Sequence, residues 1–286
     1  MSEATRRALM RAAAARLDAA GIDAAGEEAR RLAEAAWGLD AAGLMARAGE
    51  AATPEAGAAL DALVSRREAR EPLSQILGRQ AFWTLDLAVT PDVLSPRADT
   101  ETIVEAGLAC IAERQSPRIL DIATGSGAIL LALLAERPDA SGLGADLSAE
   151  ALDVARRNGH ACGLADRAGF LRTRWAEGVG ARFDLVTCNP PYIASAVLDR
   201  LEPEVRDHEP RLALDGGADG LEAYRALIPG LRALLAEDAA AVLEIGYDQA
   251  GAVSALAHAH GFASALKRDL AGRDRALTLT QVPQAR

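Results

Sequence analysis

The sequence predicts an α/β protein with a doubly wound, mostly parallel sheet, preceded by a small all-α domain and a β-hairpin linker. Residues 1–71 are rich in Ala, Leu and Arg, and no segment there alternates polar and apolar residues with period two. Residues 72–100 contain such an alternation, bounded by turn-forming residues. Over residues 101–286, apolar strand-like runs alternate with helical segments, which is typical of βα units.

Composition and charge exclude several classes of protein. The 286 residues are 50% hydrophobic, and no apolar run reaches the roughly 18–20 residues that a membrane span needs. The N-terminus lacks the apolar core of a signal peptide, so we expect a cytoplasmic protein that needs no membrane. The net charge of −10 disfavours sequence-independent nucleic-acid binding, which depends on clustered cations. Cys110, Cys162 and Cys188 lie far apart and predict reduced thiols without a metal site.

Four helices are expected in the first 71 residues. Thr53-Pro54 is a typical helix start, with Thr as the N-cap and Pro at the first helical position. Gly21 and Gly38 are typical helix ends. The expected helices cover residues 5–20, 23–37, 40–48 and 54–70. Together they predict a small helical bundle.

The linker and the third region supply the strands. Residues 82–89 alternate as a strand does, and Thr90-Pro91-Asp92 predicts a turn. In the third region, strands are expected over residues 118–123, 141–146, 183–188, 240–246, 264–268 and 276–281. Helices are expected over residues 128–137, 149–162, 221–236 and 249–260. Ligands of such sheets bind at the carboxyl ends of the strands, so the residues that follow the strands are the candidates for a site.

A glycine-rich turn follows the first strand of the third region. It reads Asp121-Ile122-Ala123-Thr124-Gly125-Ser126-Gly127, and its glycines allow a sharp turn and a close approach to a ligand. The dinucleotide-binding fingerprint needs a third glycine at position 130, where Leu130 stands, so a nicotinamide oxidoreductase is disfavoured. This spacing of Asp and Gly instead resembles the cofactor loop of Rossmann-like methyltransferases.

Asp146 ends the next strand, nineteen residues after Gly127. A carboxylate at this place can accept hydrogen bonds from both ribose hydroxyls of a nucleoside. Nicotinamide-dependent enzymes and methyltransferases share this arrangement, so Asp146 alone does not separate them. The alternative is that Asp146 caps the helix that begins near Ser148.

The tetrapeptide Asn189-Pro190-Pro191-Tyr192 follows the strand at 183–188. Two consecutive prolines fix φ and remove two backbone donors, so carbonyl oxygens at this turn stay free to accept hydrogen bonds. With the side-chain carbonyl of Asn189, they can hold a planar –NH₂ group by both N–H bonds, and Tyr192 would supply a flat wall. The motif therefore predicts methylation of an exocyclic base amine or a carboxamide. The alternative is a rigid turn without a site.

Over nearly its full length, the sequence resembles the protein-(glutamine-N5) methyltransferases that modify bacterial class-1 peptide chain release factors. The motifs that carry the resemblance lie at 78–82, 94–101, 121–128, 189–192, 204–217, 244–249 and 269–275. The stretch 204–217 is the most specific, because nucleic-acid methyltransferases with an Asn-Pro-Pro-Tyr motif generally lack it. The family implies a small helical domain over residues 1–71 and a Rossmann-like class I methyltransferase domain over residues 101–286.

The resemblance implies S-adenosyl-L-methionine as the co-substrate, with no metal. Asp146 would hold its ribose, and Trp175 would pack near its adenine. The residues that would line its methionine and ribose side are Ala123, Thr124, Gly125, Ser126 and Gly127.

The resemblance also implies the protein substrate. The methyl group would be transferred to the side-chain amide of Gln in the Gly-Gly-Gln motif of the release factor, and no nucleic acid would be required. Asn189 and the Pro190 carbonyl would hold this amide, and Asn189 would also touch the cofactor. Pro191 and Tyr192 would shape the pocket, and residues 1–71 would recognise the release factor.

Two positions depart from the family pattern. Ala123 stands where the family usually has Gly, and its methyl group is expected to fit if φ is negative there. Arg174 precedes Trp175 where a small polar or acidic residue is more usual, so the alternative for Trp175 is an ordinary half-buried aromatic residue.

Several weaker candidates and rival functions stay open. Arg97 and Thr100 could reach the methionine end or the protein substrate, or Thr100 could only cap a helix. His208 is interpreted as a surface imidazole and Cys188 as a small buried residue. The rival functions are a nucleic-acid amino methyltransferase, which would use the same tetrapeptide, and a non-catalytic module that binds the release factor through residues 1–71.

Overall fold

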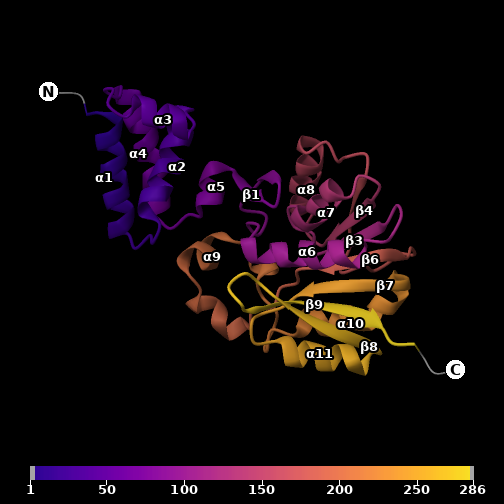
Figure 1. The fold of residues 1–286 in the computed structure, drawn as a ribbon. Coiled ribbons are helices and arrows are strands. Elements are labelled where there is room, and N and C mark those ends of the chain that lie inside the picture. Colours follow the sequence, from indigo (N-terminus) through magenta and orange to yellow (C-terminus); the bar gives the residue numbers. More distant parts are fainter. Residues whose placement is uncertain (1–3, 284–286) are drawn as a thin grey trace. The chain divides into compact units, whose positions relative to one another are not determined.

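The computed structural model describes residues 4–283 and divides into two compact units. The first unit holds the residues up to Gly78 together with Glu202–His208. The second holds Arg79–Leu201 and the chain from Glu209 onward. Figure 1 shows the helices and strands of both units, coloured along the sequence. A short segment from the middle of the chain therefore belongs to the N-terminal unit.

The first unit is a bundle of helices with an aliphatic interior. Leu17, Leu32 and Val64 are fully buried and come from three different helices. The four expected helices are confirmed, and Thr53 caps the fourth by accepting a hydrogen bond from the Ala56 N–H. The sequence does not predict α5 and α9, because each is too short to show a helical period. The helices are α1 (Arg6–Ala19), α2 (Ala25–Trp37), α3 (Ala41–Arg47), α4 (Pro54–Glu68), α5 (Leu73–Leu77) and α9 (Pro203–His208).

A buried charge cluster ties α9 to α2 and α4 within this unit. Arg67 of α4 is only 5% exposed, and it pairs with Glu28 of α2 at 2.5 Å and with Glu204 of α9 at 2.8 Å. Arg70 also contacts Glu204 at 2.8 Å. Because these charges are largely withdrawn from water, the loss of one partner would leave another without compensation.

The second unit is built on a seven-stranded sheet with the strand order β5-β4-β3-β6-β7-β9-β8. The strands from β5 to β7 in this order run parallel, and β9 is antiparallel to both of its neighbours. The predicted mostly parallel sheet is confirmed. The strands are β3 (Arg118–Ile122), β4 (Ser141–Asp146), β5 (Ala168–Arg172), β6 (Phe183–Cys188), β7 (Leu235–Glu244), β8 (Phe262–Arg268) and β9 (Asp274–Gln281).

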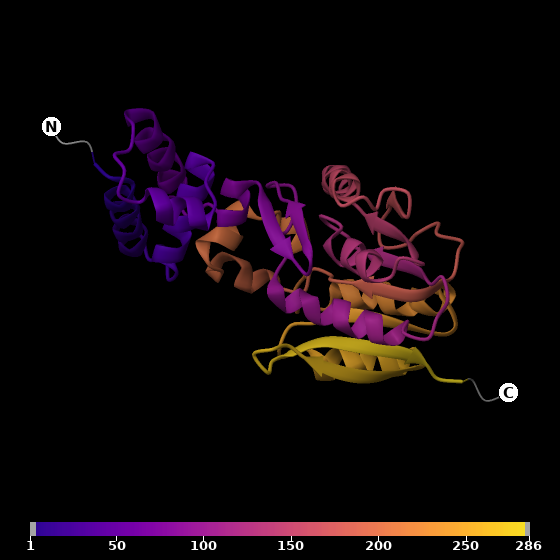
Figure 2. The same ribbon diagram turned by 45° about the horizontal axis from the view of Figure 1, so that its top comes forward.

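Helices cover both faces of the sheet, as a doubly wound fold requires (Figures 1 and 2). Alternate residues of a strand point to opposite faces, so Leu120 packs in one core, with Leu231, and Ile119 in the other, with Leu130. The first face carries α10 (Glu222–Leu234) and α11 (Ala250–Ala259). The second carries α6 (Glu101–Cys110), α7 (Ala128–Glu136) and α8 (Ala149–Ala161). Short 3-10 helices lie at Ala98–Thr100, Ser195–Arg200 and Arg211–Ala213.

A hairpin of β1 (Arg79–Phe82) and β2 (Leu85–Ala88) begins the second unit (Figure 2). The hairpin predicted for the linker is confirmed, but the single strand expected over residues 82–89 is wrong, because Trp83 and Thr84 form the turn. Trp83 has φ +55°, a left-handed conformation that a pattern of residue types does not reveal.

Candidate active site

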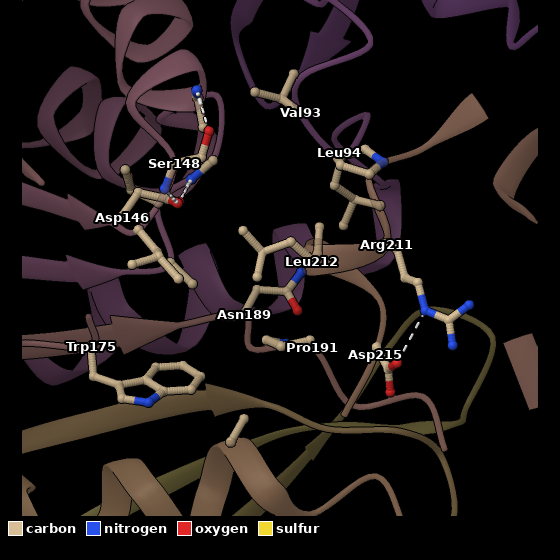
Figure 3. A pocket seen from close by; sticks show the side chains of 18 of the residues that line it. Val93, Leu94, Asp146, Ser148, Trp175, Asn189, Pro191, Arg211, Leu212 and Asp215 are labelled. Atoms are coloured by element: carbon tan, nitrogen blue, oxygen red, sulfur yellow. Dashed lines mark hydrogen bonds and ion pairs between the residues drawn. The ribbon is translucent and has the colours of Figure 1, made fainter. Parts of the chain in front are cut away.

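A cavity of about 1400 Å³ opens in the second unit at the carboxyl ends of the parallel strands. One wall, here called the glycine side, consists of residues 123–126, 146–148 and 175. The opposite wall, here called the loop side, comes from residues 92–97 and most of residues 210–217. Figure 3 shows Asn189 and Pro191 between these two walls. The tetrapeptide therefore stands where groups bound on the two sides would meet.

The glycine turn bends the chain from β3 into α7 through three residues with positive φ. Ala123, Gly125 and Gly127 have φ values of +55°, +54° and +82°. A Cβ atom at Gly127 would lie 3.3 Å from the Cβ of Ala155, so both space and conformation favour glycine there. The negative φ under which the Ala123 methyl group was expected to fit is wrong. An L-residue is held here in a region that glycine prefers, at a cost of about 1 kcal/mol.

Asp146 is fixed at the end of β4 by backbone donors. The Gly125 N–H donates to its Oδ2 and the Ser148 N–H to its Oδ1, both at 2.9 Å. Helix α8 has its own cap, because Ser148 Oγ accepts from the Ala151 N–H at 3.0 Å. Each oxygen of an ionised carboxylate has further acceptor capacity. Asp146 can therefore still accept two donors from a bound group.

Asp121 supports the glycine turn from behind. It is fully buried, and its carboxylate accepts from Thr124 Oγ1 at 2.6 Å and from Thr187 Oγ1 of β6 at 2.7 Å. Burial raises the pKa of Asp121 from 3.8 to about 6, and the two hydroxyl donors limit the rise. Cys188, also on β6, is buried as expected, and burial raises the pKa of its thiol. Asp121 thus joins the turn to the strand that carries Asn189.

Trp175 lies on the glycine side, with its ring directed toward the cavity (Figure 3). Its Nε1 is buried and has no hydrogen-bond partner among residues 4–283. A buried indole N–H normally finds an acceptor. The ring presents a flat face toward the cavity, which suits a planar heterocycle.

The corner at 189–191 keeps its acceptor oxygens available. Asn189 Nδ2 donates to Thr100 Oγ1 at 3.4 Å. Within the described chain, no donor is hydrogen-bonded to Asn189 Oδ1 or to the Pro190 carbonyl. The Tyr192 carbonyl, by contrast, already accepts a hydrogen bond from Gln249 Nε2 at 3.0 Å. Two free oxygens on one rigid corner can accept both N–H bonds of a planar –NH₂ group.

Tyr192 was expected to form a wall of the pocket, but it is not among the residues that line the cavity. Its hydroxyl donates to Glu244 Oε1 at 3.0 Å, because this buried carboxylate needs a donor. Burial, with the charge of Glu244, raises the pKa of the Tyr192 phenol. Of the other predicted residues, Gly127 and Pro190 do not line the cavity either. Those that do are Ala123, Thr124, Gly125, Ser126, Asp146, Trp175, Asn189 and Pro191.

The loop side joins two distant segments through Glu209. Its carboxylate accepts from the Ser95 N–H at 3.3 Å and from Arg97 Nη2 at 2.7 Å. The Glu209 side chain is 1% exposed and that of Arg97 is 49% exposed, so the guanidinium keeps donors for a bound group. Burial raises the pKa of Glu209, and Arg97 limits the rise. Glu209 is not among the residues predicted for the site, although it lies in the most specific stretch, 204–217, directly before Pro210.

Two glycines allow the segment that contains residues 216–220 to lie close against the residues that follow Asn189. A Cβ atom at Gly216 would lie 2.8 Å from Tyr192 Cα and 2.9 Å from the Pro191 oxygen. At Gly220 it would lie 2.4 Å from the Tyr192 oxygen. The Gly216 N–H also donates to the Ile193 carbonyl at 2.8 Å. The residues after the tetrapeptide therefore hold the corner in place from the loop side.

Known proteins match along most of the chain. Residues 8–78 match the PrmC N-terminal domain, and residues 100–202 match the methyltransferase small domain. The release factor glutamine methyltransferase of Rhodospirillum rubrum is 49% identical, with 87% of this chain and 77% of that protein covered. That of Cereibacter sphaeroides is 44% identical, with 96% and 98% covered. The chain belongs to the release factor glutamine methyltransferase family. A methyltransferase structure from Pyrococcus furiosus shares the fold, with 15% identity, a TM-score of 0.53, and coverage of 71% and 92%.

The match to the methyltransferase small domain includes the glycine side of the cavity but not the loop side. The methyltransferase small domain match ends at residue 202, so it includes the glycine turn, Asp146 and the tetrapeptide. The second segment of the loop side, residues 210–217, lies beyond it. Between residues 4 and 283, no helix is long and apolar enough to cross a membrane, and no group of three or more His, Cys, Asp or Glu could hold a metal ion.

Proposed function

We propose that this chain transfers a methyl group from S-adenosyl-L-methionine to the side-chain amide nitrogen of Gln in the Gly-Gly-Gln motif of bacterial class-1 release factors. The observation that carries the proposal is the corner at 189–191: Asn189 and Pro191 line the cavity, and within the described residues no donor is hydrogen-bonded to Asn189 Oδ1 or to the Pro190 carbonyl. The names of the relatives, release factor glutamine methyltransferases, support this substrate.

The glycine side fits a nucleoside with an amino-acid tail. Asp146 has acceptor capacity left for two ribose hydroxyls, and Trp175 offers a flat face to the adenine. The positive φ values at Ala123 and Gly125 let the backbone approach the tail closely. The chemistry that the co-substrate supplies is an electrophilic methyl carbon on a sulfonium.

The corner would hold and aim the acceptor nitrogen. Asn189 Oδ1 and the Pro190 carbonyl would each accept one N–H of the Gln amide, and Pro191 would wall its plane. Fixing the nitrogen in this way lowers the barrier through placement and electrostatics. The new C–N bond forms as the carbon–sulfur bond breaks, and the nitrogen then gives up one proton. Because that proton is strongly acidic after methylation, water can accept it and no strong base is required.

We propose that residues 1–71 recognise the body of the release factor, that residues 72–100 act as a linker and that residues 101–286 carry out the transfer. The match of residues 8–78 to an N-terminal domain named for this family supports a dedicated role for the helices. A reaction on a translation factor belongs in the cytoplasm, and it requires no nucleic acid bound to the enzyme.

The decisive experiment is methylation of a purified release factor. The chain is incubated with methyl-labelled co-substrate and a class-1 release factor, and the Gly-Gly-Gln peptide is analysed by mass spectrometry. One added methyl group on the Gln side chain is the expected result. Parallel incubations contain RNA or DNA. Label in the nucleic acid, with none in the release factor, would overturn the proposal in favour of an amino methyltransferase of nucleic acids.

A further inference from the structure

Asn158 is a buried amide that the proposed reaction leaves without a role. It lies inside α8 and is 1% exposed. Its Oδ1 accepts from the Ala88 N–H at 2.7 Å, and its Nδ2 donates to the Ser126 carbonyl at 2.9 Å and to the Ala88 carbonyl at 3.1 Å. Because both hydrogens and the oxygen of the amide have partners, these partners fix its orientation. Asn is a weak helix former, so the benefit of this residue lies in its contacts.

One of these contacts supports the glycine side. Thr124 and Gly125, which precede Ser126 in the glycine turn, are held by carboxylates of β3 and β4. Ser126 is held instead by α8, through its carbonyl and the amide of Asn158. All three residues of the turn line the cavity. Asn158 thus fixes part of the wall against which the co-substrate would lie.

The other contacts hold the segment that leads into the loop side. Ala88 ends β2, and the chain continues from it into residues 92–97. Helix α8 holds this segment a second time, because Val89 and Val93 are buried in one cluster with Val154. Val93 lines the cavity (Figure 3). The position of this wall therefore also depends on α8.

The amide of Asn158 connects the two sides of the cavity directly. Its –NH₂ group lies between the Ser126 carbonyl of one side and the Ala88 carbonyl at the start of the other. An aliphatic side chain of similar size could fill the same space, but it would leave these carbonyls and the Ala88 N–H without their partner. In a transfer between two bound groups, a misplacement of about 1 Å can lower the rate about 100-fold.

We propose that Asn158 is a positioning residue that fixes the spacing between the glycine side and the loop side. The inference rests on the proposed function, in which the methyl carbon is held on the glycine side and the Gln amide is held between the two sides. Without the amide of Asn158, each side would still form, but their separation would vary. Turnover should therefore fall much more than the affinity for the co-substrate.

The test measures kcat in two variants at saturating co-substrate and Gly-Gly-Gln peptide. Asn158→Leu removes all three hydrogen bonds and should lower kcat about 100-fold. Asn158→Asp keeps an acceptor for the Ala88 N–H, but it carries at most one hydrogen for two carbonyl oxygens, so its kcat should lie between those of the wild type and Asn158→Leu. Co-substrate affinity, measured by calorimetry, should change much less than kcat in both variants.

A matched control separates positioning from a general loss of stability. Leu234, at the end of α10, is buried in the core but does not line the cavity. Leu234→Ala should lower the melting temperature, as a core truncation does, and keep the wild-type kcat at the assay temperature. Amide hydrogen exchange supplies a readout without turnover. Residues 88 and 92–97 should exchange faster in Asn158→Leu than in the wild type, and Leu234→Ala should leave these rates unchanged.

Three results would overturn the inference. They are wild-type kcat in both Asn158 variants, an equal loss of kcat in Leu234→Ala, and unchanged amide exchange over residues 92–97 in Asn158→Leu. A loss confined to co-substrate affinity would also overturn it, because Asn158 would then serve the glycine side alone. If Asn158→Leu does not fold, Asn158→Asp decides. A wild-type enzyme that does not methylate the peptide would refute the proposed function, and the exchange rates would still test the link between the two sides.

Discussion

The two sides of the cavity are assembled in different ways. The glycine side comes from short stretches that directly follow neighbouring parallel strands, and backbone N–H groups hold its carboxylate, Asp146. The loop side joins segments that are 114 residues apart in sequence, through the contact of Ser95 with Glu209. Under the proposed function, local chain geometry would hold the co-substrate. The protein substrate would meet a surface that only the complete fold brings together.

The corner between the two sides provides the strongest test of this comparison. Asn189→Ala removes one of the two acceptors for the substrate amide, so kcat should fall about 100- to 1000-fold, as it does when one preorganised polar group is lost. Binding of the co-substrate, measured by calorimetry, should change little. If binding and turnover fell together, Asn189 would have to be assigned to the glycine side.

A change behind the glycine side should affect stability more than turnover. The pKa of Asp121 is about 6 in the folded protein and 3.8 ordinarily. The contribution of this difference to the free energy of unfolding is therefore fully present below pH 3.8 and is lost as the pH rises to about 6. The difference corresponds to about 3 kcal/mol. Asp121→Asn should remove this loss. The free energy of unfolding, measured by denaturant titration, should therefore fall less between acid and neutral pH than in the wild type. Parallel pH curves for the two proteins would contradict the prediction.

The carboxylate of the glycine side should affect the co-substrate alone. Asp146→Ala removes two charge-assisted hydrogen bonds to the ribose and should weaken co-substrate binding by about 2 kcal/mol, or roughly 30-fold. The KM for the release factor should hardly change. Asp153→Ala, on the exposed face of α8, is the control and should bind normally. A larger effect on the release factor than on the co-substrate would erase the distinction between the two sides.

The smallest expected effect concerns the strained residue of the glycine side. Ala123→Gly relieves the left-handed conformation at φ +55°, but it also frees the unfolded chain. We expect a net gain of about 0.5 kcal/mol in stability, measured as a small rise in melting temperature. A loss of stability of similar size would show that the methyl group contributes packing that outweighs the strain.

Local patterns predicted much of the fold and of the glycine side. The strand at 183–188 appears with the expected bounds, because an apolar run ends at a proline-rich turn. β5 escaped prediction because Gly169 and exposed neighbours interrupt its pattern. The direction of Tyr192 could not be predicted, since it depends on Glu244, 52 residues away. Glu209 and Glu244 were missed as partners for the same reason: a sequence shows a buried carboxylate only through neighbours that the fold supplies.

The membership of α9 in the helical unit limits how this protein can be divided. The chain passes from one unit to the other three times, at 78/79, 201/202 and 208/209. A fragment that starts at Arg79 would retain α9 and lose Arg67 and Arg70, the cations that hold Glu204. An exchange of the N-terminal helices between homologues would need to carry α9 along or recreate both arginines. The N-terminal helices and α9 are therefore best kept together in any engineered fragment.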